Sequence, residues 1–191
     1  MRFRFIFAQL LFVTITCFSQ TAQTPYSSKG LGDIIYPGTV NNNGMGGISI
    51  AYPSNINFNL INPALLSINS LTTFEVGFTG ERRSITSDTL RQNNGSGNLS
   101  YLALCFPLVS GHFSTGFSLT PYSYVNYNIK SEIPVIGSTD TVDINYKGSG
   151  GVNSLSWSNG VLLFKSLALG VRLSYLFGSI TDETVFDLAQ V

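Results

Sequence analysis

The residues that could carry chemistry in this chain are few and scattered. His112 is the one histidine of the sequence, and Ser110 stands two residues before it in a predicted turn. A serine and a histidine without a placed carboxylate do not make a nucleophilic triad. No cluster of His, Cys, Asp or Glu has the spacing of a metal site, and the glycine run at 148–151 lacks the lysine and helix of a phosphate-binding loop. We therefore expect no enzyme, no catalytic residue, no metal and no cofactor.

Two charged residues stand in unusual positions. Glu75 and Arg172 each lie in the middle of a stretch in which every second residue is apolar. In an extended strand, such residues project from the face opposite the apolar one. If the apolar face meets lipid, both charges point into the interior of a barrel. There they would set selectivity or pair with a plug, and one hypothesis is that Arg172 anchors such a plug. The favoured interpretation is a hydrated interior residue without a special role.

The strand that would position Arg172 is the clearest element of the sequence. Within residues 167–177 every odd position is large and apolar, and every even position except Leu176 is small or charged. The odd positions are Leu167, Leu169, Val171, Leu173, Tyr175 and Phe177. A period of two over about ten residues suits a tilted strand that crosses a bilayer. The pattern predicts an all-β fold, a transmembrane antiparallel β-barrel.

Composition agrees with a protein that faces lipid on one side. Charged residues make up 10% of the chain, against about 25% in ordinary soluble domains. No apolar run after the first residues reaches the ~18 positions of a spanning helix. The net charge is zero, which speaks against a nucleic-acid partner.

The beginning of the chain has the layout of a secretory signal peptide. Arg2 and Arg4 precede an apolar run, and a polar stretch follows it. We expect residues 1–19 to be the signal peptide, with cleavage after Ser19; cleavage after Ala22 is the second choice. Lipid attachment at Cys17 is a less favoured alternative, because the residues before it do not suit that modification.

The remaining chain divides into an irregular part and a strand-rich part. Residues 20–70 are rich in Asn, Gly and Pro, with one helical turn expected near 63–66. Irregular backbone at membrane depth needs protein around it, so we interpret 20–70 as an N-terminal plug or hatch. Residues 71–191 are interpreted as part of an outer-membrane β-barrel.

About six strands are expected in that second part. They are separated by short turns at 109–112 and 165–166 and by long loops at 81–97 and 134–140, with another loop beginning at 181. The expected strands cover residues 73–80, 99–106, 113–129, 155–164 and 167–177. One more strand is expected to open at 142 and to be bent or bulged by the glycines at 148–151. Barrels of this kind start at eight strands, so we expect the chain to be the N-terminal portion of a longer protein whose C-terminal strands are missing here.

The sequence resembles the FadL-type outer-membrane transport proteins. Met45-Gly46-Gly47, followed by Asn62-Pro63-Ala64 directly before the first strand, resembles the N-terminal hatch of that family. Segments 26–33, 120–123, 148–153 and 174–179 look like a Bacteroidota branch of it. The resemblance implies a fourteen-stranded barrel that carries fatty acids or other hydrophobic compounds. It also implies that Gly46, Gly47, Asn62, Pro63 and Ala64 bind the ligand or move to open a path.

Three functions remain open from the sequence. The first is a passive outer-membrane channel for small hydrophobic compounds such as fatty acids. The second is a structural barrel subunit of an outer-membrane secretion or assembly complex, which would have other outer-membrane proteins as partners. The third is a secreted soluble β-sandwich, which so few charged residues disfavour. The first two imply contact with outer-membrane lipid.

Overall fold

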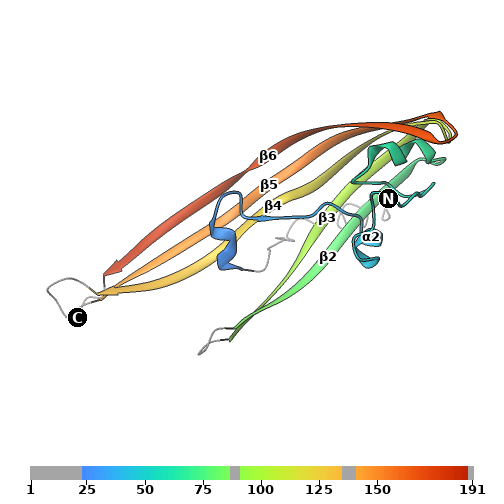
Figure 1. Ribbon diagram of the computed structural model, residues 1–191. Helices are drawn as coiled ribbons and strands as arrows, with labels where there is room; N and C mark the ends of the chain where they lie inside the picture. Colours follow the sequence, from blue (N-terminus) through green and yellow to red (C-terminus); the bar gives the residue numbers. More distant parts are fainter. Residues whose placement is uncertain (1–22, 87–90, 135–140, 189–191) are drawn as a thin grey trace, which may run out of the picture.

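A computed structural model describes residues 23–86, 91–134 and 141–188 of the chain. Its main body is one antiparallel sheet whose long strands run in chain order, from β2 to β6 (Figure 1). They are β2 (Thr73–Thr86), β3 (Arg91–Val109), β4 (Phe113–Pro134), β5 (Thr141–Phe164) and β6 (Leu167–Leu188). A short strand, β1 (Asp33–Ile34), pairs with β4 and makes the sheet six-stranded.

The predicted all-β antiparallel sheet is therefore confirmed. Among the described residues no pairing joins β2 to β6, so the sheet is open, and the closed barrel stays a prediction. None of the helices in this part of the chain has the length and apolar content that crossing a membrane requires. The expected signal peptide, both cleavage positions and Cys17 lie outside the described residues.

Several strand limits differ from the prediction. The expected loop at 81–97 is mostly a hairpin, in which β2 and β3 pair from Gly80–Gly97 out to Thr86–Arg91. The strand expected to open at 142 and the one expected at 155–164 form a single strand, β5. β6 continues to Leu188, although a loop was expected to begin at 181. Polar, glycine-rich segments pair here because strand pairing satisfies their backbone groups without an apolar face. The short turns at 109–112 and 165–166 are confirmed.

The sheet has two chemically different faces near its short turns. The outer face carries the apolar stripe of β6 and, through the strand register, Trp157, Phe117 and Phe74. Trp157 and Phe117 stack with ring centroids 6.4 Å apart. The inner face of the same region carries small residues, among them the buried Ser114, Ser118, Ser154, Ser156 and Ser158.

Beyond this region the apolar side chains change faces. In β5, Leu155 and Trp157 lie on the outer face, whereas Val142, Ile144 and Tyr146 lie on the inner face. The outer face of this far half instead carries the exposed charges Asp143 and Lys147 of β5 and, on the paired strands, Lys130, Glu132 and Glu183. The change falls at the glycine bend Gly150–Gly151, where both residues have positive φ, 116° and 159°. The far halves of β4, β5 and β6 are thus polar outside and partly apolar inside.

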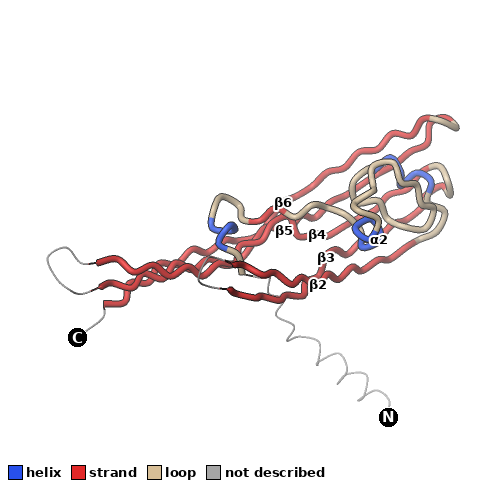
Figure 2. The backbone as a smooth tube through the Cα atoms, turned by 60° about the horizontal axis from the view of Figure 1, so that its bottom comes forward, coloured by secondary structure: helices blue, strands red, loops and turns tan. Residues whose placement is uncertain are grey.

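Residues 23–70 lie against the inner face (Figure 2). They contain three short helices, η2 (Pro25–Ser28), α2 (Val40–Gly44) and η3 (Pro63–Ile68). The expected helical turn near 63–66 is confirmed as η3. The small buried core of the molecule joins this segment to β3: it consists of Phe58, Leu60, Leu66, Tyr101, Ala103 and Cys105.

Candidate functional site

The predicted hatch motif Asn62-Pro63-Ala64 forms the beginning of η3. The Asn62 side chain accepts a hydrogen bond from the Ala64 backbone N–H at 3.1 Å, which caps the helix, and Pro63 occupies the first position, where no N–H is needed. The Ser67 hydroxyl donates to the Ala64 carbonyl at 2.7 Å. The motif therefore has a local structural role, which does not depend on any transported compound.

Glycines on the sheet let η3 approach the inner face closely. A Cβ atom at Gly170 would lie 2.1 Å from the Ala64 nitrogen, and one at Gly160 would lie 2.4 Å from the Pro63 oxygen. Gly116 has the same relation to the Phe58 ring, at 2.5 Å. At Gly160 and Gly170 backbone thus meets backbone, and at Gly116 an aromatic ring meets backbone; a side chain at any of the three positions would prevent this approach.

The two predicted interior charges, Glu75 and Arg172, hold adjacent residues of the segment. The Glu75 carboxylate on β2 accepts a hydrogen bond from the Phe58 backbone N–H. The Arg172 guanidinium on β6 donates to the Asn59 carbonyl at 3.4 Å and to the Ser158 hydroxyl at 3.0 Å. A carboxylate and a guanidinium from the two outermost strands therefore grip one short stretch of backbone, which we call the 58–59 clamp.

We expect Glu75→Ala to lower the free energy of unfolding by about 2 kcal/mol, because it leaves the backbone N–H of the buried Phe58 without its charged acceptor. Arg172→Ala should cost less, since its bond to Asn59 is the longer one. The double variant should cost less than the sum, because both side chains hold the same backbone. Denaturant unfolding of the refolded protein measures all three.

Glu132→Ala is the matched control for the clamp. It makes the same change at an exposed position of β4, and we expect an effect within about 0.5 kcal/mol. Strictly additive costs for the Glu75 and Arg172 variants would show that the two charges act independently, which would contradict the clamp.

The other predicted site residues, Gly46 and Gly47, lie apart from the clamp, directly after α2. Their φ angles are 75° and 85°, and an added Cβ at either would meet no atom within 4 Å. Their N–H groups donate to the Asn43 and Asn42 carbonyls, at 3.1 Å and 2.7 Å, and so close the turn. Glycine is required here for its backbone conformation. A gating role for these residues stays a prediction.

A second feature of the inner face was not predicted: β3 and β4 separate. They pair only between Leu102–Val109 and Phe113–Leu119, near their common turn. Farther on, β1 takes the place of β3 beside β4, with Asp33 opposite Tyr124 and Ile34 opposite Ser123. The ribbon shows β2 and β3 diverging from the other three strands toward their far ends (Figure 1).

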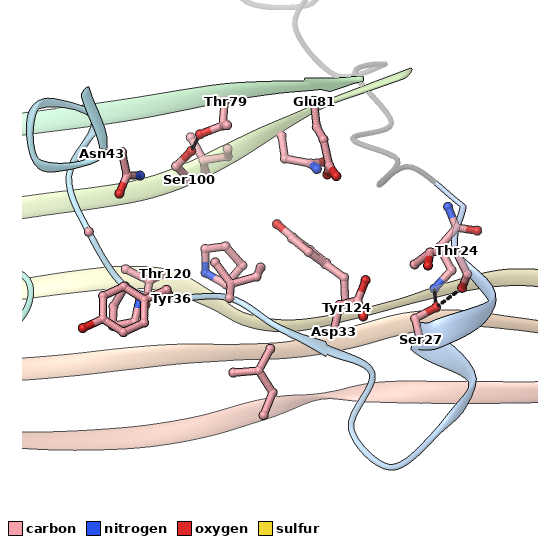
Figure 3. A pocket seen from close by; sticks show the side chains of 18 of the residues that line it. Thr24, Ser27, Asp33, Tyr36, Asn43, Thr79, Glu81, Ser100, Thr120 and Tyr124 are labelled. Carbon is pink, nitrogen blue, oxygen red and sulfur yellow. Dashed lines mark hydrogen bonds between the residues drawn. The ribbon is translucent and has the colours of Figure 1, made fainter. Parts of the chain in front are cut away.

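The separation leaves a cavity of about 470 Å³ between residues 33–38, the β2–β3 hairpin and β4. We call this cavity the strand slot. Figure 3 shows Thr79 and Ser100 on one side of it and Tyr36, Thr120 and Tyr124 on the other. The Thr79 and Ser100 hydroxyls form a hydrogen bond with each other. The lining combines hydroxyls and aromatic rings, and its charged residues are Asp33, Glu81 and Arg83.

Those three charged residues connect β1 to β2 across the slot. Arg83 pairs with Asp33 at 3.1 Å and with Glu81 at 2.7 Å, and all three side chains are about one-third or more exposed. Asn94 adds a second link on the β3 side by donating to the Gln23 carbonyl at 3.0 Å. The N-terminal segment is thus bound to both of the separated halves of the sheet.

We expect Arg83→Ala to lower the free energy of unfolding by less than about 1 kcal/mol, because an exposed ion pair is screened by solvent. Hydrogen exchange at Ile35, whose N–H donates to the Tyr122 carbonyl at 2.9 Å, should nevertheless become faster. Arg82→Ala removes the same charge from the neighbouring position and should change neither quantity. Equal exchange in both variants would show that Arg83 does not retain β1.

The described part of the chain contains no group of three or more His, Cys, Asp or Glu that could hold a metal ion. His112 lies in the exposed turn between β3 and β4, where its backbone N–H donates to the Val109 carbonyl at 2.9 Å.

Comparison with known proteins gives one match. The family model BamG matches the chain over residues 1–191, while no curated protein and no solved structure matches it. The resemblance to FadL-type transport proteins is therefore wrong. The motif that suggested it, Asn62-Pro63-Ala64, is accounted for by helix capping and by close packing on Gly160 and Gly170. Of the functions left open by the sequence, the match supports the assembly-complex subunit rather than the fatty-acid channel. The chain belongs to the BamG family, which is associated with the Bam complex, the outer-membrane assembly machinery.

Proposed function

We propose that this protein is a structural subunit of the outer-membrane assembly complex, with its sheet in the outer membrane and residues 23–70 held on the inner face. The observation that carries the proposal is the family match over the whole chain. The role needs neither a catalytic group nor a cofactor. Its partners would be other outer-membrane proteins of the complex and outer-membrane lipid.

The distribution of apolar side chains supports the membrane orientation. Leu169, Val171 and Leu173 are 52%, 63% and 60% exposed, and on the outer face of β2 Phe74 and Phe78 are 68% and 72% exposed. So wide an exposed apolar surface is unusual on a protein surrounded by water. Lipid would cover it at no cost, with the polar far halves of the strands in water beyond the bilayer.

The contacts of residues 23–70 support a structural rather than a transporting role. Residues 58–67 of this segment are held on the sheet by the 58–59 clamp, by the close approach at Gly160 and Gly170, and by the buried core. A segment fixed at so many points is suited to keeping a surface in shape for a partner.

The proposal is tested by purifying the full-length protein, tagged on its chromosomal copy, from native membranes in mild detergent. We expect the core barrel of the assembly machinery to copurify in constant stoichiometry. Depletion should lower the amounts of several unrelated outer-membrane barrels together. A protein that purifies alone, and whose depletion leaves those barrels at normal levels, would refute the proposed role.

A further inference from the structure

On the side of β1 that faces the strand slot, the backbone groups of Ile34 and of the nearby Tyr36 have no hydrogen-bond partner in the described structure. In an antiparallel pair, successive residues direct their backbone N–H and C=O groups to opposite sides. Ile35 donates to the Tyr122 carbonyl of β4, so the neighbouring residues Ile34 and Tyr36 direct their backbone groups away from β4, toward the slot. Within the described residues neither has a backbone partner there.

The opposite wall of the slot is also strand backbone. From Arg91 to Tyr101, β3 pairs with β2 on one side and has no residue in register with β4 on the other. The slot thus separates two extended segments of one sheet, β1 and β3. Neighbouring strands are about 4.8 Å apart, and a gap in a sheet is filled most completely by another strand.

We propose that the strand slot receives one extended, uncharged polypeptide segment from another subunit of the complex. The backbone of this segment pairs with the free backbone groups of Ile34 and Tyr36. This inference rests on the proposed function and names the kind of partner contact. Added strands of this type bind through main-chain hydrogen bonds and gain specificity from every second side chain. Toward the Thr24 end of the slot, the ion pairs among Asp33, Glu81 and Arg83 mark the limit of the uncharged part (Figure 3).

The chemistry of the slot favours a polypeptide over a lipid chain. The slot presents the hydroxyls of Thr79, Ser100 and Thr120 beside the Tyr36 and Tyr124 rings. It also presents the unpaired backbone groups of Ile34 and Tyr36, which are costly to bury without partners. A hydrocarbon chain offers no donor or acceptor to Ile34 and Tyr36, whereas a strand offers both in alternation.

The test combines a photo-crosslinker with slot-filling variants in cells that carry the full-length protein. Benzoylphenylalanine replaces Tyr36 in the slot or, as a control, Phe74 on the outer face. Ser100→Phe and Thr120→Phe fill the slot from opposite walls. Ser149→Phe makes the same serine-to-phenylalanine change on β5, at a residue that does not line the slot.

We expect the probe at residue 36 to crosslink to one extended segment of a single subunit that copurifies with the complex. The yield should fall at least about tenfold in Ser100→Phe and Thr120→Phe and stay unchanged in Ser149→Phe. If the wild-type protein copurifies with the complex, either of two results would overturn the inference. One is a crosslink that persists in both slot-filling variants, and the other is adducts with lipid alone. Loss of copurification in the wild type would instead refute the proposed function itself.

Discussion

Replacing Gly170 by alanine is expected to detach η3 from the sheet and to lower the free energy of unfolding by about 3 kcal/mol or more. The added methyl group would lie 2.1 Å from the Ala64 nitrogen and 2.5 Å from the Pro63 carbonyl carbon. Both are backbone atoms, so neither can rotate away as a side chain would. Inserting one carbon into a packed interior commonly costs about 1–3 kcal/mol, and a contact this short against backbone belongs at or above the upper limit.

The effect of Gly170→Ala can be measured by denaturant unfolding and by limited proteolysis of residues 23–70, which should become accessible. Gly97→Ala is the matched control: it adds the same methyl group to a strand where no atom lies within 4 Å, and the residues 23–70 should stay protected. If Gly170→Ala left both stability and protection unchanged, η3 would not rest on the sheet as described.

Val171→Arg should be the most damaging substitution on the outer face, with a loss of about 2–4 kcal/mol in a bilayer. Val171 is 63% exposed and stands between Leu169 and Leu173 on the apolar stripe of β6. In the proposed orientation, an arginine there would have to enter hydrocarbon. Unfolding of the full-length protein in lipid vesicles, followed by its heat-modifiable migration on a gel, measures the loss.

Glu183→Arg is the control on the same strand and the same face. Residue 183 lies in the polar far half of β6, where arginine stays in water. We expect a loss of no more than about 1 kcal/mol, which comes from placing the arginine opposite Lys147 on β5. Equal losses for the two variants would show that the outer face of β6 does not meet lipid.

The sequence predicts the sheet well where one face is continuously apolar, and poorly where the faces exchange. In residues 167–177 the apolar side chains stay at odd positions, which predicts a strand, and β6 confirms it. In β5 the apolar residues change from odd positions, Leu155 and Trp157, to even positions, Ile144 and Tyr146. The sequence predicts a bend at the glycines 148–151 but two separate strands on either side, whereas the structure has one strand. A period-two pattern assigns residues to a face, but it contains no signal that separates a bend within a strand from the end of that strand.

The candidate site was predictable in part for a similar reason. The alternation predicts that Glu75 and Arg172 lie on the face opposite the apolar stripe, and both contact residues 58–59 on that face. Their role in a barrel interior stays a prediction. Their joint hold on Phe58 and Asn59 could not be foreseen, because it depends on how an irregular segment crosses the sheet. The sequence does not predict the strand slot, because the alternation of apolar and polar residues in β3 and β4 does not change where the two strands separate. The nearest signal is the long run of polar residues at 81–97.

The exchange of apolar residues between the two faces also bears on how deep the protein can sit. In the proposed orientation, a shift of the sheet along the membrane normal toward the far ends of its strands would expose the apolar stripe of β6 to water. A shift along the membrane normal in the opposite direction would move Lys147 and, after it, Asp143 into hydrocarbon. Both displacements raise the free energy, so the sequence itself fixes the depth of the sheet in the membrane. A partner bound at the strand slot would therefore be held at a fixed height relative to the membrane surface, without any contact dedicated to setting it.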